Sequence, residues 1–518
     1  MHLFFAAFLL VALSACSRGP EVYVDSELLI GQYHEDTSIA VFRGVPFAEP
    51  PLGDLRWRAP RPLQTKLPRR ETKEFAPACM QSMRILDWYR YMAETFGGSG
   101  NYYPDLEIDE DCLYLNVWTP TLESDAKLPV MVWIHGGSNR SGWSYEPNYY
   151  GHALAERGVI VVSIAYRVGV FGFLSHPELN PDEPMANFGL WDSVAALRWI
   201  QNNIEQFGGD PDRITLFGES SGAQDILALA FAAPAAGLFR RVILESTAGY
   251  GAGRMTTLAE EQQRGSELTR IMGFEGGESL ALLRQVPADV LLQTYEESFP
   301  DYYHSPAIDD QLLSSSTWAN IEASNFGDVQ MLIGTNHAEW LDYISVDATM
   351  QDVIQTAEDL THIDSARALA AVAQEQDPRR AMDRLITADN YVCPSQYTAA
   401  KLAATGQGAW MYFFTREREG AAGAKLGAYH GAELPYVFGT HDSYMTTTDV
   451  DVALTDTIMG YWTQFAATGN PNAERLPDWP RFRAPDFAVQ ELGDSVLTIP
   501  APEPVLCGLF GEWAAARQ

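Results

Sequence analysis

The chain has 518 residues, 46% of them hydrophobic, and a formal net charge of −33. Such an acidic surface repels the phosphates of nucleic acids and disfavours loose adsorption to anionic lipid, so neither is expected as a partner. The length is ample for a large buried core, and large α/β enzymes of this size can form one unit.

The chain begins with an apolar run over residues 4–13, which is too short to span a bilayer but fits the central region of a secretory signal. The run ends in residues 13–16 (Leu-Ser-Ala-Cys), which resemble the bacterial lipoprotein box. In lipoproteins the signal is cut before the cysteine, whose thiol then carries lipid. This resemblance implies a signal peptide over 1–15, a lipid anchor on Cys16 and a polar tether over 16–27. The protein would be exported and held at the outer membrane or cell surface.

The alternative is a plain signal cut near Ala15, which would leave a periplasmic or secreted protein. The first residues contain no Lys or Arg, unlike the usual start of a signal, but Leu13 fits poorly at the −3 position of a plain cleavage site. Without Cys16, four cysteines remain: Cys79, Cys112, Cys393 and Cys507. An even number in an exported protein favours two disulfides, and four cysteines allow three connectivities.

Apolar runs separated by helical patterns follow along the chain. Residues 193–207 are predicted to be helical because apolar residues recur there at steps of three and four. The runs read as strands lie at 128–135, 158–166, 213–217, 241–244, 330–334 and 410–414. Continuous apolar strands between helices predict an α/β fold with a large, mostly parallel sheet flanked by helices. The helix-rich stretches 255–300 and 350–390 are expected to be insertions over the functional edge of one catalytic domain, residues 28–518.

Residues 218–222 (Gly-Glu-Ser-Ser-Gly) directly follow the predicted strand at 213–217. This is the G-x-S-x-G nucleophile elbow in its required position between a strand and a probable helix, with Ser220 as the nucleophile. The glycines leave room for a sharp, strained turn. The pattern alone is a weak signal because Gly and Ser are common in turns.

Two further segments supply what a serine nucleophile needs. Residues 135–138 (His-Gly-Gly-Ser) follow a strand, and a loop of this kind lends backbone N–H groups to an oxyanion hole. The candidate base is His430, which is followed by glycine in a loop and lies after both the nucleophile and the acid, as α/β-hydrolase order requires. On order alone, four other histidines are rivals: His304, His337, His362 and His441.

The candidate acid is Glu339, which lies just beyond the strand that ends near residue 334. Its role would be to hold the imidazole tautomer and to stabilise the imidazolium. Asp309, Asp310 and Asp342 are rivals.

These residues resemble the type-B carboxylesterase family, which includes the cholinesterases, over nearly all of the mature chain. Residues 42–57 (Phe-Arg-Gly-Val-Pro-Phe-Ala-Glu-Pro-Pro-Leu-Gly-Asp-Leu-Arg-Trp) are similar to the family's opening motif, and 110–116 (Glu-Asp-Cys-Leu-Tyr-Leu-Asn) to its second signature. Residues 207–211 (Phe-Gly-Gly-Asp-Pro) lead into the elbow as in the family. The region from residue 461 to residue 480 resembles the C-terminal region of the family.

The resemblance implies an α/β-hydrolase fold and a carboxylic-ester hydrolase that needs no metal or cofactor and acts on a small-molecule ester. It implies Ser220 as nucleophile, His430 as base and Glu339 as acid. The remaining implied roles are oxyanion donors at Gly137, Ser138 and Ser221, a carboxylate pair Glu219–Glu433, an ion pair Arg56–Glu110, and disulfides Cys79–Cys112 and Cys393–Cys507. Two negative charges at short distance repel each other, so ionising both carboxyl groups of the Glu219–Glu433 pair costs free energy. One of the two should therefore have a raised pKa.

Four residues depart from the family's usual choices, and they predict a polar or bulky substrate. Ser138 stands where a third glycine is common, and Ser221 where alanine is common. Gln224 and Asp225 make the first helical turn after the elbow more polar than usual.

Two other functions are weighed against an esterase. Some relatives are adhesion proteins that lost the catalytic residues, but Ser220, Glu339 and His430 are all present here. A lipase acting on aggregated lipid is the other alternative, although no amphipathic lid segment stands out.

Overall fold

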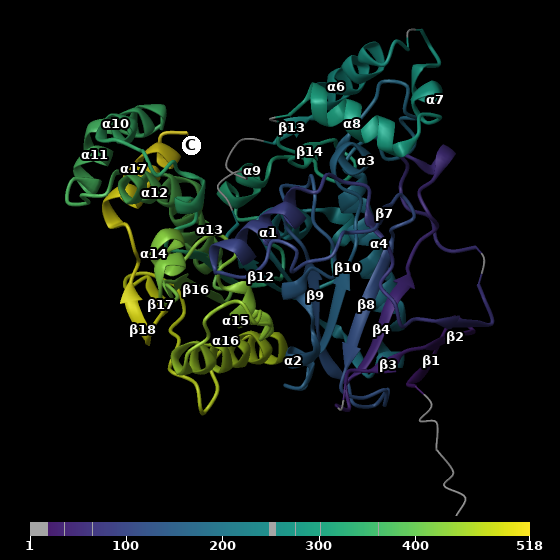
Figure 1. Cartoon of the computed structure of the whole chain (residues 1–518), viewed down its shortest axis with the longest axis horizontal. Coiled ribbons are helices and arrows are strands. Elements are labelled where there is room, and N and C mark those ends of the chain that lie inside the picture. The colour runs from purple at the N-terminus through teal and green to yellow at the C-terminus, as the bar shows by residue number, and fades with distance from the viewer. Residues whose placement is uncertain are drawn as a thin grey trace, which may run out of the picture.

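An 11-stranded sheet runs through the centre of the computed structural model, which describes residues 19–517 except 36, 65, 248–254, 275, 301 and 361 (Figure 1). In spatial order its strands are β18 (Val496–Pro500), β17 (Ala488–Leu492), β16 (Ala409–Phe414), β15 (Gln330–Asn336), β12 (Arg241–Glu245), β11 (Gly209–Glu219), β9 (Leu128–Ile134), β10 (Ile160–Ile164), β8 (Tyr114–Thr119), β4 (Ala40–Pro46) and β3 (Gln32–Tyr33). The strands from β17 through β10 are parallel, and both edges are antiparallel. The predicted α/β fold with a mostly parallel sheet is confirmed.

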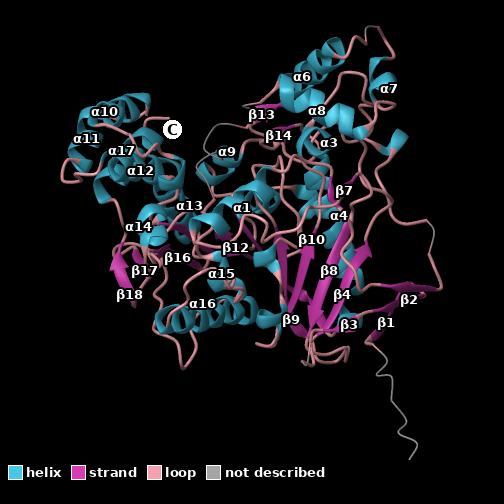
Figure 2. Ribbon diagram, viewed as in Figure 1, coloured by secondary structure: helices cyan, strands magenta, loops and turns pink. Residues whose placement is uncertain are grey.

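Both faces of the sheet are buried, which explains why its strands are continuously apolar. Along β9, Val130 and Val132 belong to the core on one face, whereas Met131 and Trp133 belong to the core on the other. Because successive strand residues point to opposite faces, a strand buried on both sides has no solvent-facing positions and is mostly apolar. Figure 2 shows helices on both faces of this sheet.

Most helices either cover one face of the sheet or belong to one of two further groups. The first face is covered by α4 (Phe188–Asn203), α5 (Ser221–Ala230) and α13 (Cys393–Ala404), and the second by α2 (His152–Ala155), α15 (Leu434–Phe438) and α16 (Asp449–Thr468). One helical insertion, here called the cap, holds α6 (Leu258–Ile271), α7 (Ser279–Leu283) and α8 (Ala288–Ser298). A second group holds α10 (Met350–Asp359), α11 (Ser365–Val372), α12 (Pro378–Thr387) and the C-terminal α17 (Pro504–Ala515).

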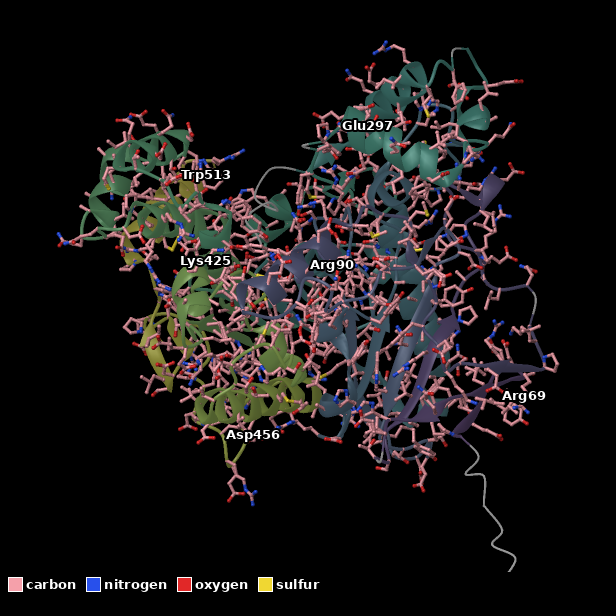
Figure 3. The ribbon with its side chains drawn as sticks, in the orientation of Figure 1. Arg69, Arg90, Glu297, Lys425, Asp456 and Trp513 are labelled. Atoms are coloured by element: carbon pink, nitrogen blue, oxygen red, sulfur yellow. A yellow bond between two sulfur atoms is a disulfide. The ribbon has the colours of Figure 1, made fainter. Side chains whose placement is uncertain are left out.

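The remaining elements are short. The other helices are α1 (Arg84–Thr95), α3 (Gly169–Phe173), α9 (Thr317–Glu322) and α14 (Ala421–Leu426). The small sheets pair β1 (Glu21–Val24) with β2 (Glu27–Ile30) and β5 (Arg69–Glu71), β6 (Ala78–Cys79) with β7 (Ile108–Asp109), and β13 (Thr256–Thr257) with β14 (Ala307–Ile308). In Figure 3, Arg90 marks α1 near the middle of the view, Glu297 marks the cap above it, and Trp513 marks the second group at its upper left.

The prediction of a tether reaching residue 27 is wrong, because residues 21–27 already belong to the folded unit. In β1, Val22 and Val24 are buried while their neighbours are exposed, and the strand pairs with β2. This alternation over four residues is too short to stand out in the sequence. The predicted signal peptide and Cys16 lie outside the described residues. Within the described part of the chain, no helix is long and apolar enough to cross a membrane.

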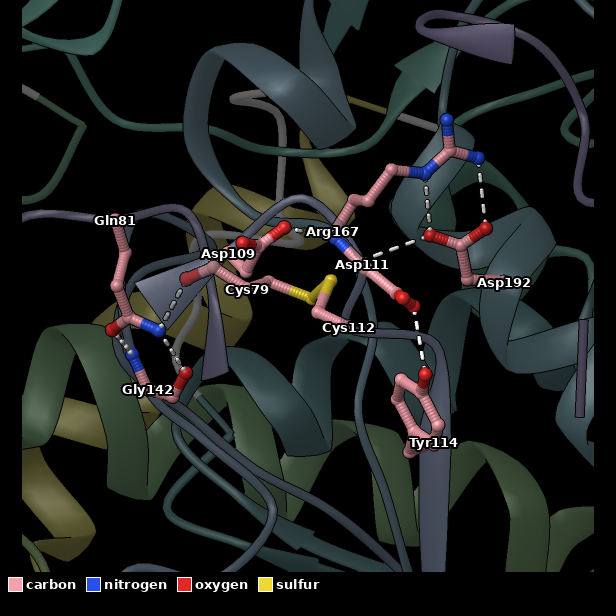
Figure 4. The surroundings of a disulfide bond; sticks show 9 residues. All are labelled: Cys79, Gln81, Asp109, Asp111, Cys112, Tyr114, Gly142, Arg167 and Asp192. Atoms are coloured by element: carbon pink, nitrogen blue, oxygen red, sulfur yellow. Dashed lines mark hydrogen bonds and ion pairs between the residues drawn. A yellow bond between two sulfur atoms is a disulfide. The ribbon is translucent and has the colours of Figure 1, made fainter. Parts of the chain in front are cut away.

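Both disulfides that the resemblance implies are present. Cys393 and Cys507 join α13 to α17, with an S–S distance of 2.03 Å. Cys79 and Cys112 close the loop that carries α1, and Gln81, two residues beyond Cys79, exchanges hydrogen bonds with Gly142 (Figure 4). The Arg56–Glu110 ion pair is also present and bidentate, with N–O distances of 2.7 and 2.5 Å.

Candidate active site

Ser220 occupies a sharp turn between β11, which ends at Glu219, and α5, which begins at Ser221. Its φ of 56° and ψ of −126° are strained for a residue with a side chain. The Ser220 N–H donates to the carbonyl of Glu245 at 2.9 Å, which holds the turn against the neighbouring strand β12. The side chain is half-buried and faces a cavity.

The two glycines of the elbow are required by close packing rather than by their own flexibility. A Cβ on Gly218 would lie 2.5 Å from the carbonyl oxygen of Ile134, and one on Gly222 would lie 2.1 Å from the same atom. Both contacts are shorter than van der Waals distances, so only glycine lets the elbow approach the end of β9. The oxyanion loop, defined here as residues 135–142, begins at that end.

His430 and Glu339 come together from two separate loops. The Nδ1 of His430 lies 2.6 Å from Oε2 of Glu339, whose other oxygen accepts from the N–H of Asn336 at 2.7 Å. Glu339 is buried, whereas His430 lines the same cavity as Ser220. This is the arrangement in which a carboxylate orients an imidazole and stabilises its protonated form.

The other ring nitrogen of His430 contacts a second carboxylate. Nε2 lies 3.0 Å from Oε1 of Glu219, the residue just before Ser220. Burial lowers the pKa of His430, but Glu219 and Glu339 together raise it well above its usual value. The resemblance implies a pair of Glu219 with Glu433, and no motif in the sequence predicts the contact of Glu219 with His430.

Further carboxyl groups are buried around the elbow and the cavity. Burial and the nearby Glu219 raise the pKa of Glu433 to about 8, and Asn336 donates a hydrogen bond to it. Burial also raises the pKa of Glu146 to about 8 and, together with Glu433, that of Glu245 well above its usual range. At neutral pH these groups hold protons and add little negative charge. Glu146 and Glu245 were missed because neither belongs to a motif.

The oxyanion loop has left-handed backbone at three successive residues. The φ angles are 106° at Gly137, 62° at Ser138 and 54° at Asn139. A Cβ on Gly137 would lie 2.0 Å from the carbonyl oxygen of Ser141, so glycine is required there. Gly137, Ser138 and Ser221 line the cavity together with Ser220, which is where oxyanion donors must be.

The cavity has a volume of about 570 Å³ and is largely aromatic. Its aromatic lining consists of Trp88, Tyr89, Tyr91, Tyr149, Tyr303, Trp340, Tyr343 and Tyr391. Three of these belong to α1, Trp340 and Tyr343 lie between β15 and α10, and Tyr391 lies between α12 and α13. A cavity of this size can take a drug-sized ligand.

The rival histidines and aspartates have other partners or positions. His362 contacts Asp389 at 2.6 Å, and His441 lies between Arg418 and Thr455. His304 is buried and His337 is half-buried, and both lie outside the cavity lining. Asp309 accepts backbone N–H groups of its own turn, and Asp310 is exposed. Asp342 accepts from the Tyr91 hydroxyl at 2.7 Å. Among these candidates, the structure joins only Glu339 and His430 at the cavity of Ser220.

Two of the four unusual residues have structural partners rather than positions in the cavity lining. Gln224 accepts a hydrogen bond from the Tyr303 hydroxyl at 2.6 Å, and Asp225 accepts from Nδ2 of Asn139 at 3.0 Å. Ser138 and Ser221 do line the cavity. The expectation that all four act on the substrate is therefore reduced to these two serines.

Comparisons with known proteins agree with this geometry. The model of the Carboxylesterase family matches residues 19–497. The chain is 31% identical over 471 residues to a fumonisin B1 esterase of Sphingopyxis macrogoltabida, covering 86% of this chain and 82% of that protein.

Solved structures of esterases share the fold. A PNB esterase superposes with a TM-score of 0.81 and 28% identity, over 94% of this chain and 98% of the other. A thermophilic PNB esterase gives a TM-score of 0.77 and 29% identity, over 93% of this chain and 98% of the other. The chain thus belongs to the carboxylesterase family and is a carboxylic-ester hydrolase that acts on small-molecule esters.

Proposed function

We propose that the chain is a serine carboxylesterase in which Ser220 forms an acyl-enzyme. The observation that supports this most directly is the 2.6 Å contact that holds His430 on Glu339 in the cavity of Ser220. A serine hydroxyl is a poor nucleophile until a base removes its proton, and His430 is the base that this cavity offers.

The proposed reaction has two halves. As its contact with Glu219 breaks, Nε2 of His430 releases its proton to solvent. The neutral ring then takes the proton of the Ser220 hydroxyl as Oγ attacks the ester carbonyl. The N–H groups of Gly137, Ser138 and Ser221 stabilise the oxyanion of the tetrahedral intermediate. His430 then gives the proton to the departing alkoxide, which leaves as the alcohol.

The second half repeats these steps with water. His430 takes a proton from a water molecule, whose oxygen attacks the acyl-enzyme, and returns it to Oγ of Ser220 as the acid leaves. Throughout, Glu339 stabilises the imidazolium, and Glu433 supports Glu339 through their common hydrogen-bond partner Asn336.

An active-site label tests this assignment directly. An organophosphate should modify the protein at one site and abolish hydrolysis of p-nitrophenyl butyrate, and peptide mass mapping should place the label on Ser220. A protein that binds esters without hydrolysing them would not react. A label on Ser221, or hydrolysis that survives complete labelling, would contradict the proposal.

We also propose that the natural substrate is a bulky ester, which the large aromatic cavity and the relative named for fumonisin B1 both support. A panel that varies the acyl chain and the alcohol separately should show kcat/KM rising with the size of at least one part. A steady fall of kcat/KM with increasing size on both sides would contradict this.

We further propose that Cys16 is lipidated and anchors the exported protein to a membrane. Residues 13–16 (Leu-Ser-Ala-Cys) support this. The variant Cys16→Ser should move the protein from the membrane fraction to the soluble fraction, because a serine cannot accept the lipid thioether. Unchanged fractionation of Cys16→Ser would mean that another feature holds the protein at the membrane.

A further inference from the structure

Asn139 connects the oxyanion loop to the helix that follows the nucleophile. Its N–H donates to Oγ of Ser221 at 3.2 Å, and its Nδ2 donates to Oδ1 of Asp225 at 3.0 Å. Its carbonyl accepts from the N–H of Gly169 at 2.6 Å. Asn139 is fully buried, at 0% exposed, and Asp225 is 1% exposed. The loop is thus attached to α5 by a buried polar pair.

The loop needs such an attachment because its backbone is strained. Ser138 and Asn139 are both left-handed, with φ of 62° and 54°, and this costs about 1 kcal/mol or more for each residue with a side chain. Strained backbone is kept only where the contacts around it hold it in place. At the far end of the loop, the two hydrogen bonds between Gln81 and Gly142 hold the chain. At the end next to the nucleophile, the Tyr166 hydroxyl donates to the carbonyl of His135 at 2.6 Å, and Asn139 joins the loop to α5.

We propose that Asn139 and Asp225 are positioning residues that set the distance between the two halves of the oxyanion hole. Gly137 and Ser138 supply donors from the loop, and Ser221 supplies the donor from α5. The bond from Asn139 to Ser221 and the bond from Asn139 to Asp225 both cross between these two segments. The inference rests on the proposed function, since it assigns a role to the contacts that frame the donors.

The expected effect falls on the transition state. Donors of an oxyanion hole act at 2.7–3.1 Å from the developing charge, and a misplacement of about 1 Å can cost about 10²-fold in rate. Ground-state binding depends mostly on the aromatic walls, which this pair does not touch. A loss of positioning should therefore lower kcat and leave KM nearly unchanged.

The Asp225 carboxyl acts here as a hydrogen-bond acceptor of fixed shape. Burial raises its pKa to about 8, so at neutral pH it is mostly uncharged. An asparagine at this position presents a carbonyl oxygen in the same place. Asp225→Asn should then preserve the positioning, whereas Asp225→Ala should remove it.

The test compares Asn139→Ala, Asp225→Ala and Asp225→Asn at neutral pH, with kcat expressed per active site titrated by an organophosphate. Both alanine variants should lose about 10- to 100-fold in kcat while KM changes by less than about threefold. The inhibition constant of a trifluoromethyl ketone, which forms an oxyanion on Ser220, should rise by a similar factor. Asp225→Asn should stay within about threefold of the parent protein.

Asn187 provides a matched control for Asn139. It is also buried and left-handed, with a φ of 57°, and its Nδ2 donates to Oδ2 of Asp309 at 3.0 Å. It precedes α4, and it is not among the residues that line the cavity in the described part of the chain. Asn187→Ala therefore imposes the same backbone strain and the same kind of lost bond, and should lower the unfolding temperature without changing kcat per titrated site.

Three results would overturn the inference: an unchanged kcat per titrated site in both alanine variants, an equal loss in Asn187→Ala, or no recovery in Asp225→Asn. If Asn139→Ala does not fold, Asn139→Gly removes the side chain without the left-handed penalty and serves in its place. A parent protein that is not labelled on Ser220 would contradict the proposed function instead. If the parent protein is labelled on Ser220 but the alanine variants keep the parent kcat, only the positioning role is contradicted.

Discussion

Replacing Ser220 by alanine should lower kcat for p-nitrophenyl butyrate by about 10⁶, because removing the serine of a catalytic triad costs about that much. The neighbouring hydroxyl of Ser221 is not expected to replace it, because that hydroxyl accepts a hydrogen bond from the N–H of Asn139 and lies inside the first turn of α5. The measurement is the rate of p-nitrophenol release, followed for long enough to separate the residual rate of the variant from spontaneous hydrolysis of the ester in buffer.

Ser221→Ala is the control for this variant. Its backbone N–H remains, so the variant should keep a burst of p-nitrophenol and should still be labelled by an organophosphate. If Ser220→Ala has the unfolding temperature of the parent protein and still hydrolyses the ester well above buffer, Ser220 is not the nucleophile.

Replacing Glu339 by glutamine should lower kcat by about 10⁴, the cost found when an amide replaces the acid of a triad. The carboxylate accepts from Nδ1 of His430 at 2.6 Å and from the N–H of Asn336 at 2.7 Å. An amide cannot accept on both sides, so the imidazole would take the wrong tautomer and its protonated form would lose a counter-charge. The measurement is kcat at saturating ester, with the unfolding temperature recorded in parallel.

Asp342→Asn is the matched control, because Asp342 lies beside the cavity and is a rival candidate for the acid in the sequence. It contacts the Tyr91 hydroxyl rather than His430, so kcat should stay within about threefold of the parent value. A larger loss in Asp342→Asn than in Glu339→Gln would reverse the assignment of the acid.

Much of the frame could be predicted because it depends on local patterns. The strand before Ser220 is buried from Ile214 onward because both faces of the sheet are covered, and the elbow follows it directly. The strand leading to residues 135–138 could be found in the same way. The N-terminal tether was predicted wrongly, because β1 is recognisable only once β2 lies beside it.

The contacts that complete the site depend on segments far apart in the sequence. No spacing in the sequence relates Asn139 to Asp225, and each alone reads as an ordinary polar residue. The contact between Glu219 and His430 joins residues more than two hundred positions apart. Such pairs follow from how loops pack at the ends of different strands, which the hydrophobic pattern does not encode.

The two carboxylates on His430, Glu219 and Glu339, also bear on the release of the acid product. Hydrolysis converts a neutral ester into an acid that ionises at neutral pH, so a negative charge forms close to these two groups. Like charges at short range in a partly dry site repel each other, and the departing anion is released from that repulsion. An acid anion that enters from solution meets the same repulsion, so the enzyme should be inhibited only weakly by its acid product.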